Sequence, residues 1–288
     1  MLKYKVCADA SADIPAEVAK RYSIHTLGIP VTVGEESYIS GVKLDNNTFY
    51  QLMEDCDTIP ITSQITPYEF NELYKAEWAD GTEHLLIFLL NSKGSATYAN
   101  AVGSLDKFFE HHPDAKDAIS IHILDGGSYT MGFGYAAVLA AQKLEMGMDV
   151  GEVLELVKGQ LQRQAILFGM YTLKYAGKSG RIPSAAVFVG ETLGIKPIMR
   201  VFDHQIITAG KARGEKKLVR EVVKMTLADM QPGTPYCVGY GSDTAARDEM
   251  IEEATRKIGY PPVYLFQVGP AISANTGARV VGIVYEAK

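Results

Sequence analysis

The chain has 288 residues, of which 47% are hydrophobic and 22% charged, and its formal net charge is −6. This length predicts about two domains, and the composition is ordinary for a soluble globular protein. The acidic balance argues against a nucleic-acid-binding protein, which usually has a basic face, and no basic run is long enough to indicate binding to an anionic membrane.

The cysteines and the N-terminal segment predict a cytoplasmic protein. Cys7, Cys56 and Cys237 are odd in number and far apart, which indicates reduced thiols. The start, MLKYKVCADA, lacks the apolar core of a signal peptide. No apolar run approaches the roughly 20 residues that cross a bilayer, so we expect no membrane span.

Short apolar runs bounded by turn or polar residues predict buried strands. In chain order these runs are 4–8, 85–90, 119–124, 236–240, 263–268 and 280–285. Apolar stripes with helical spacing predict three helices, around residues 70–78, 153–161 and 250–258. Ser242 or Asp243 is the expected N-cap of the last helix.

Strands that alternate with helices predict βαβ units and a mostly parallel sheet. Ligand sites of such sheets gather at the carboxyl ends of the strands. A domain boundary is expected near residues 155–165. After it, residues 177–213 form a long polar and glycine-rich passage that precedes a second set of strands and helices.

Several familiar motifs are incomplete. GKS at 177–179 lacks the glycine that a P-loop needs five residues earlier, where Thr172 stands. GFGYAA at 132–137 fits G-x-G-x-x-A but lies too far after the preceding strand for a dinucleotide site, so helix packing through small residues is the better interpretation. The histidines show no H-x-x-x-H or H-E-x-x-H spacing, and no G-x-S-x-G elbow marks a hydrolase nucleophile.

Two clusters of hydroxyl side chains carry the clearest functional signal. Thr62 and Ser63 lie in a loop before the first predicted helix, and Ser92 and Ser95 follow the strand at 85–90. A strand end that opens a helix has free backbone N–H groups, and the helix dipole favours an anion there. Hydroxyls and amides together predict a neutral cradle for an oxyanion. The alternative is that these residues only cap helices and form turns.

Eight motifs extend this pattern over most of the chain. They are DASAD (9–13), TSQ (62–64), SKGSATY (92–98), LDGGSYTMGFG (124–134), TLKYAGKSGRI (172–182), GIKPIM (194–199), KARG (211–214) and GPAISANTG (269–277). In this order the sequence resembles the DegV family of bacterial fatty-acid-binding proteins.

The resemblance implies a two-domain α/β fold of the DegV type. Residues 1–158 would form a Rossmann-like, three-layer α/β/α domain with a parallel sheet, and residues 159–288 an α/β domain with a mixed sheet. A long-chain fatty acid such as palmitate would be buried in a tunnel between the domains, and no other cofactor is implied. The family's carboxylate ligands would fall on Thr62 and on Ser95 or Ser92.

The same resemblance implies a partner. In the family, the bound acid is presented to a separate fatty acid kinase, which phosphorylates the carboxyl group, so the binding protein itself is not an enzyme. Arg181, Lys196 and Arg213 lie in matching motifs and would dock that kinase. The alternative is that they are solvated surface residues with a few ion pairs.

The sequence departs from the family pattern at three positions, Ile65, Ala96 and Asn275. Asn275 stands where the family has a histidine. An asparagine amide donates a hydrogen bond to a carboxylate as a histidine does, but it carries no charge. Asn275 therefore remains a predicted carboxylate ligand.

Two other functions stay open at this point. The first is a small-molecule kinase or phosphotransfer subunit related to dihydroxyacetone kinase, against which the incomplete P-loop argues. The second is a hydrolase with Ser92 or Ser95 as nucleophile, against which the lack of a histidine in the matching motifs argues.

Overall fold

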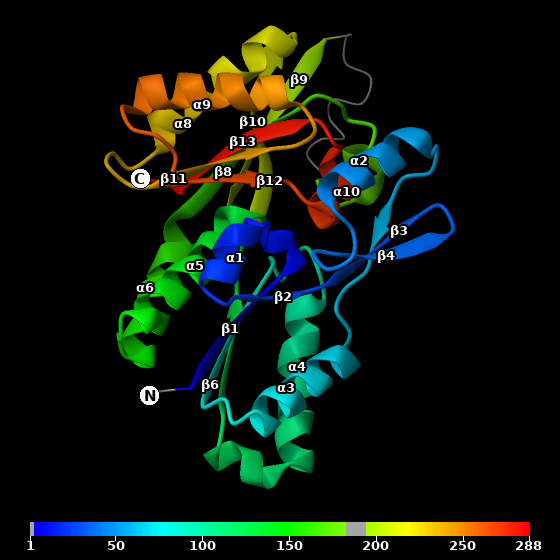
Figure 1. Cartoon of the computed structure of the whole chain (residues 1–288). Helices are drawn as coiled ribbons and strands as arrows, with labels where there is room; N and C mark the ends of the chain where they lie inside the picture. Colours follow the sequence, from blue (N-terminus) through cyan, green and yellow to red (C-terminus); the bar gives the residue numbers. More distant parts are fainter. Residues whose placement is uncertain (1–2, 183–193) are drawn as a thin grey trace.

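The computed structural model describes residues 3–182 and 194–288. The first sheet is parallel and has the strand order β2-β1-β6-β7 (Figure 1). Its strands are β1 (Tyr4–Asp9), β2 (His25–Leu27), β6 (His84–Leu89) and β7 (Ser120–Asp125). Helices α3 (Pro67–Ala79) and α4 (Thr97–His111) cover one face, and α5 (Met131–Glu145) covers the other. This is the three-layer α/β/α arrangement that the resemblance implied.

Alternation along β6 explains these layers. Successive side chains of a strand point to opposite faces of the sheet. Leu85 and Ile87 accordingly pack in the cluster with the aromatic side chains of α3 and α4, whereas Leu86 and Phe88 pack in the cluster with α5. An uninterrupted apolar run thus fits a strand that is buried on both faces.

The second sheet has the order β10-β9-β8-β13-β11-β12. Its strands are β8 (Gln164–Met170), β9 (Ile195–Phe202), β10 (Gln205–Arg213), β11 (Tyr236–Tyr240), β12 (Tyr264–Gln267) and β13 (Val280–Glu286). Helices α8 (Leu218–Asp229) and α9 (Thr244–Ile258) pack on its outer face. In the described residues β11 and β12 are parallel and the other neighbours are antiparallel, so the mixed sheet is confirmed and the mostly parallel pattern holds only for the first sheet.

A small third sheet, β4-β3-β5, lies beside the two large ones. It contains β3 (Ile29–Val33), β4 (Glu36–Ser40) and β5 (Ile61–Thr62), and it packs near α2 (Asn46–Asp55) and α10 (Pro270–Thr276). The remaining elements are α1 (Ala16–Arg21), α6 (Val150–Arg163), α7 (Ala176–Ser179) and the short 3-10 turns η1 (Ala10–Ala12), η2 (Pro113–Asp117) and η4 (Glu215–Lys217). Because β5 pairs with β3, Thr62 is fixed opposite Val31.

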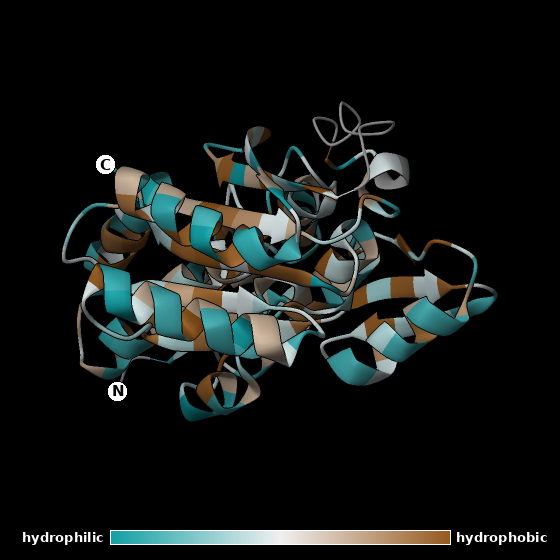
Figure 2. Ribbon diagram, turned by 90° about the horizontal axis from the view of Figure 1, so that it is seen from above, coloured by the Kyte–Doolittle hydropathy of each residue, from teal (hydrophilic) through white to brown (hydrophobic). Residues whose placement is uncertain are grey.

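Helix α5 lies between the two large sheets. It contacts β1 and β6 of the first sheet and β8 and β13 of the second, and one hydrophobic cluster contains residues from both sheets. The outer helices have hydrophilic outer faces, and the strands between them are largely hydrophobic (Figure 2). The glycines of GFGYAA allow this close packing, since a Cβ on Gly134 would lie 2.6 Å from the Ala12 carbonyl oxygen. The small-residue interpretation of this motif is confirmed.

The elements expected from the pattern are present, and others were missed. Each of the six predicted runs forms a strand, and the three apolar stripes belong to α3, α6 and α9. Asp243 is the N-cap of α9, and its side chain accepts a hydrogen bond of 3.0 Å from the Ala246 amide. The passage at 177–213 was not expected to contain strands, yet β9 and most of β10 lie there. The residues of β9 are buried or half-buried, those of β10 are mostly exposed or half-buried, and basic residues interrupt the apolar runs.

The predicted domain boundary between residues 158 and 159 falls inside α6 and stays a prediction. The chain passes from the first sheet to the second where α6 ends at Arg163 and β8 begins at Gln164. Among the described residues, no helix combines the length and the apolar character that crossing a membrane requires.

We predict that Gly134→Ala destabilises the protein by about 1–3 kcal/mol, because its methyl group would collide with the backbone of η1. Gly103→Ala in α4 is the matched control. A Cβ there meets nothing within 4 Å, so alanine should raise stability by about 0.5–1 kcal/mol through its helix propensity. Urea unfolding of both variants measures the difference. Equal midpoints would contradict the packing role of Gly134.

Candidate functional site

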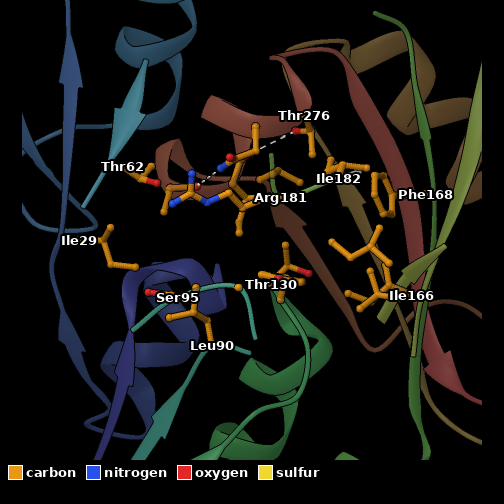
Figure 3. A pocket seen from close by; sticks show the side chains of 18 of the residues that line it. Ile29, Thr62, Leu90, Ser95, Thr130, Ile166, Phe168, Arg181, Ile182 and Thr276 are labelled. Carbon is orange, nitrogen blue, oxygen red and sulfur yellow. Dashed lines mark hydrogen bonds between the residues drawn. The ribbon is translucent and has the colours of Figure 1, made fainter. Parts of the chain in front are cut away.

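A cavity that is partly open to solvent, with about 1090 Å³ of empty space when that open solvent is included, lies where the second sheet, the loops of the first sheet and α10 meet (Figure 3). Much of its wall is apolar. The second sheet contributes Ile166, Phe168, Val201, Phe266 and Val280 to that wall. The lining also contains polar side chains from three separate elements. The cavity thus has the composition of a site for an elongated molecule with an apolar body and one polar group.

Three of the four predicted carboxylate ligands line this cavity. Thr62 comes from β5, Ser95 from the loop after β6, and Asn275 from α10. Figure 3 shows Thr62 and Ser95 near the same end of the cavity, with Ile166 and Phe168 farther along it. Ser92 is not part of the lining, and its backbone amide donates a 3.1 Å hydrogen bond to Asp125 Oδ1.

Thr62 is positioned by the small sheet and is not a helix cap. It is half-buried and pairs with Val31, and the next residue, Ser63, donates its amide to the Pro30 carbonyl at 3.0 Å. The N-cap of α3 is Thr66, which forms a capping box with Glu69. The capping alternative therefore does not account for the Thr62 hydroxyl.

Side-chain acceptors fix the loop after β6 through its backbone amides. Asp9 Oδ2 accepts from the Leu90 amide at 2.6 Å, and Asp125 Oδ1 accepts from the Ser92 amide. Asn91 Oδ1 accepts from the Lys93 amide at 3.0 Å. Three backbone amides, those of Leu90, Ser92 and Lys93, are thereby held just before Ser95 enters the cavity wall.

Ser95 helps to form the turn at the start of α4, and it also lines the cavity. Its hydroxyl accepts from the Thr97 amide at 3.2 Å and lies 3.0 Å from the Thr97 hydroxyl, at the start of α4. Among the described residues no hydrogen-bond partner is found for the backbone amides of Ser95 and Ala96, which precede the first turn of α4. These amides and the hydroxyl of Ser95 are the neutral donors that an anion needs at this point.

Asn275 of α10 adds an amide donor to the cavity lining. Its Nδ2 donates to the Ala271 carbonyl at 3.1 Å, which engages one of the two amide hydrogens. The start of α10 is anchored by Asp13, whose Oδ1 accepts from the Gly269 amide at 2.9 Å. Burial raises the pKa of Asp13 well above its ordinary value, which the Gly269 hydrogen bond opposes.

The three predicted docking residues do not share one environment. Arg181 lines the cavity near its centre in Figure 3. The Lys196 ammonium donates to the Tyr171 carbonyl at 2.7 Å and lies 3.2 Å from Glu215, with its side chain only 16% exposed. Arg213 is exposed at the end of β10. A docking role for these residues stays a prediction, and Lys196 has an internal role as well.

Asn91 and His204 were missed by the sequence analysis. Asn91 is 1% exposed, and its Nδ2 donates to the Tyr129 hydroxyl at 3.3 Å and to the His204 carbonyl at 3.0 Å. The His204 Nδ1 lies 3.0 Å from Asn91 Oδ1 and 3.8 Å from Asp125 Oδ2. Since His204 is in the turn between β9 and β10, this cluster ties the second sheet to the first. The sequence signal for this cluster was an asparagine directly after a predicted strand, but its partner His204 lies 113 residues further along the chain.

In residues 3–182 and 194–288 no group of three or more histidine, cysteine, aspartate or glutamate side chains is placed to hold a metal ion. The contacts of the Ser95 hydroxyl are the amide and hydroxyl of Thr97, neither of which is a base. The geometry is that of a binding site for an anion, in which neutral donors and the Arg181 side chain belong to the same cavity lining.

Comparison with protein families agrees with this geometry. The sequence profile of the family described as "Uncharacterised protein, DegV family" matches residues 3–288. The chain belongs to the DegV family. A DegV domain-containing protein of Lactococcus lactis is 28% identical over 286 residues, which are 98% of this chain and 97% of that protein. A second, from Clostridium perfringens, is 27% identical over 289 residues, 98% of each chain.

Solved structures of DegV proteins share the fold. The structure of a fatty-acid-binding DegV family protein from Thermus thermophilus has a TM-score of 0.87 at 23% identity, covering 99% of this chain and 100% of that one. A stearic-acid-binding protein from Eubacterium ventriosum has a TM-score of 0.88 at 21% identity, covering 99% and 97%. At these identities the likeness establishes the two-domain DegV fold.

We predict a pH dependence of stability from Asp9. Burial raises the pKa of Asp9 from 3.8 to about 6, against hydrogen bonds from Ser11 and Leu90 that lower it. The folded state therefore binds the proton more tightly than the unfolded state does. Stability should fall by about 2 kcal/mol as the pH rises from about 4 to about 6.

The measurement is urea unfolding between pH 4 and pH 7 for the wild type and for Asp9→Asn, which has no carboxyl group to titrate. The difference between the two stability curves isolates Asp9 from the other titrating groups. Curves that run parallel over this interval would show that Asp9 does not titrate there.

Proposed function

We propose that this chain binds a long-chain fatty acid in the cavity and presents its carboxylate to a separate fatty acid kinase. The observation that carries the proposal is the convergence of Thr62, Ser95 and Asn275 on one apolar cavity. Membership of the DegV family supports it, as do the neighbours described as binding fatty acids, among them stearic, vaccenic and heptadecanoic acid.

The apolar wall supplies the affinity in this proposal. A sixteen-carbon acid has about 14 methylenes, each worth about 0.8 kcal/mol when buried, or about 11 kcal/mol in total. Lost translational and conformational freedom removes several of these. The remainder is sufficient for tight binding through the tail.

The polar end supplies orientation. A carboxylate that left water without hydrogen-bond partners would cost more than the tail contributes. The hydroxyls of Thr62 and Ser95, the amides of Ser95 and Ala96, and the Asn275 side chain are neutral donors for it. Hydrogen bonds from these neutral donors hold the anion in position, with its carboxylate oxygens available to a phosphoryl donor.

In this proposal the chain carries the acid and the kinase performs the chemistry. Arg181 is the docking residue that lies nearest to the bound acid, because it lines the same cavity. Its guanidinium would attract the phosphate groups of the nucleotide that the kinase holds. Arg213, exposed at the end of β10, would extend the same docking surface.

Replacement of both hydroxyls should weaken retention of the acid. In Thr62→Ala/Ser95→Ala the buried carboxylate loses two donors, and we expect affinity to fall at least about tenfold for each. Native mass spectrometry of the purified protein measures the fraction that retains lipid. Ser92→Ala is the matched control, since Ser92 belongs to the same loop but not to the cavity lining. Equal lipid content in the double variant and the wild type would refute the head-group assignment.

Charge reversal at Arg181 should slow the hand-over of the acid that is bound. With a bacterial fatty acid kinase and ATP, Arg181→Glu should form acyl phosphate at least about tenfold more slowly per bound palmitate than the wild type, and the rate is divided by the bound palmitate because a glutamate in the cavity lining also weakens binding. Lys158→Glu on α6, at an exposed and locally paired position, is the control for a simple change of net charge. Unchanged acyl phosphate formation in Arg181→Glu would exclude this residue from docking.

A further inference from the structure

Four residues of the second sheet form one row across the floor of the cavity. Phe168 on β8 is opposite Gly282 on β13, Gly282 is opposite Gly239 on β11, and Gly239 is opposite Phe266 on β12. All four line the cavity. Residues directly opposite each other in a sheet point to the same face. The row therefore consists of two glycines, without side chains, between two phenylalanines.

The Phe266 ring covers the first of these glycines. A Cβ on Gly239 would lie 2.4 Å from Phe266 Cζ and 2.7 Å from Cε2. The tip of the ring thus reaches across the neighbouring strand, a spacing of about 4.8 Å. Phe266 is 3% exposed, so the ring is packed in place.

The second glycine has a different environment. The atoms nearest to a Cβ on Gly282 are the Leu167 carbonyl oxygen and the Cβ and Cα of Phe168. Atoms of the Phe266 ring are not among them. The three atoms nearest to a Cβ on Gly282 thus come from the neighbouring strand β8, and Gly282 itself lines the cavity.

We infer that Phe266, folded over Gly239, limits the length of the acyl chain that the cavity accepts. This inference rests on the proposed function and deepens it, because it names a residue pair that selects among fatty acids. The ring occupies floor space that a longer chain would need, and Gly239 permits the ring to lie flat on the sheet. The ligand class is then a fatty acid whose methyl end stops at the edge of this ring.

The two residues should act in opposite directions. Gly239→Ala places a methyl group between the sheet and the ring, and the ring has to rise into the cavity because the backbone blocks the other side. Phe266→Leu removes three side-chain carbons, and in a close-packed interior additional methylenes of the ligand fill the space. We expect the preferred acid to become about two carbons shorter in Gly239→Ala and about two carbons longer in Phe266→Leu.

The double variant tests whether the pair acts as a unit. In Gly239→Ala/Phe266→Leu the smaller leucine leaves room for the new methyl group, so the two effects should offset each other. The preferred length should return to within one carbon of the wild type. Gly239→Ala should also be less stable than the wild type, because its methyl group collides with the Phe266 ring. If the two residues influenced the cavity independently of their contact, urea unfolding would find the double variant at least as unstable as Gly239→Ala, whereas relief of the collision should restore part of the lost stability.

The experiment is a competition. Purified protein is incubated with an equimolar mixture of straight saturated acids of about 12 to 20 carbons, a range over which each methylene adds about 0.8 kcal/mol of burial. Native mass spectrometry then gives the distribution of bound acids for the wild type and the three variants. Gly103→Ala in α4, where a Cβ meets nothing within 4 Å, should leave the distribution unchanged. Circular dichroism verifies that each variant is folded.

The outcomes separate this inference from the proposed function. A wild type that binds no acid from the mixture contradicts the proposed function itself. If the wild type, Phe266→Leu and the double variant all prefer acids of the same length, Phe266 does not limit the chain length. Fatty-acid binding itself is then still supported. If Gly239→Ala fails to fold, the upward shift in Phe266→Leu and its reversal in the double variant still decide the question.

Discussion

The packing of α5 between two sheets is the constraint on which the rest of the structure depends. A helix that is buried on two sides needs small residues where the backbones approach, and Gly132 and Gly134 provide them at its first turns. This contact brings the carboxyl ends of the first sheet's strands toward the inner face of the second sheet. Thr130, just before the helix, lines the cavity. The cavity thus lies before the helix begins, where the two sheets have no common layer between them.

Buried carboxylates stabilise the polar end of the cavity without contacting its contents. Asp9 and Asp125 accept hydrogen bonds from the backbone of the loop after β6, and Asp13 accepts one from the start of α10. These carboxyl groups thereby hold backbone amides in place. The described lining residues include neutral donors and Arg181 but no carboxylate, so an anion there meets no opposing acidic side chain. This division explains how a protein of net charge −6 can have a site for an acid.

Among the strands of the first sheet, β6 was the clearest in the sequence because it is buried on both faces and is an almost unbroken apolar run. The β9–β10 hairpin was missed because basic and other polar residues interrupt its apolar runs. Asp203 and His204 form its turn with left-handed backbone angles, although neither is a glycine. Local pattern alone could not reveal this turn.

Some features of the candidate site could likewise be predicted from the sequence, whereas others depend on tertiary structure. The resemblance pointed to Thr62 and to one serine of the second cluster, but only the path of the loop distinguishes Ser95, which lines the cavity, from Ser92, which does not. Lys196 looked like a surface cation because its contacts with Tyr171 and Glu215 depend on tertiary structure. The row from Phe168 to Phe266 depends on strand register, which cannot be inferred from the composition of short apolar runs.

Head and tail of the proposed ligand are recognised by different parts of the fold. The polar groups come from the small sheet, the loop after β6 and α10, whereas much of the apolar wall belongs to the second sheet. Affinity scales with the buried apolar surface of the tail, and orientation depends on a few hydrogen bonds at the head. Because these contributions lie on separate elements, the second sheet can change to accept another chain length while the polar end stays the same. A partner that contacts only the carboxylate end of the ligand would then be compatible with family members that bind different acids.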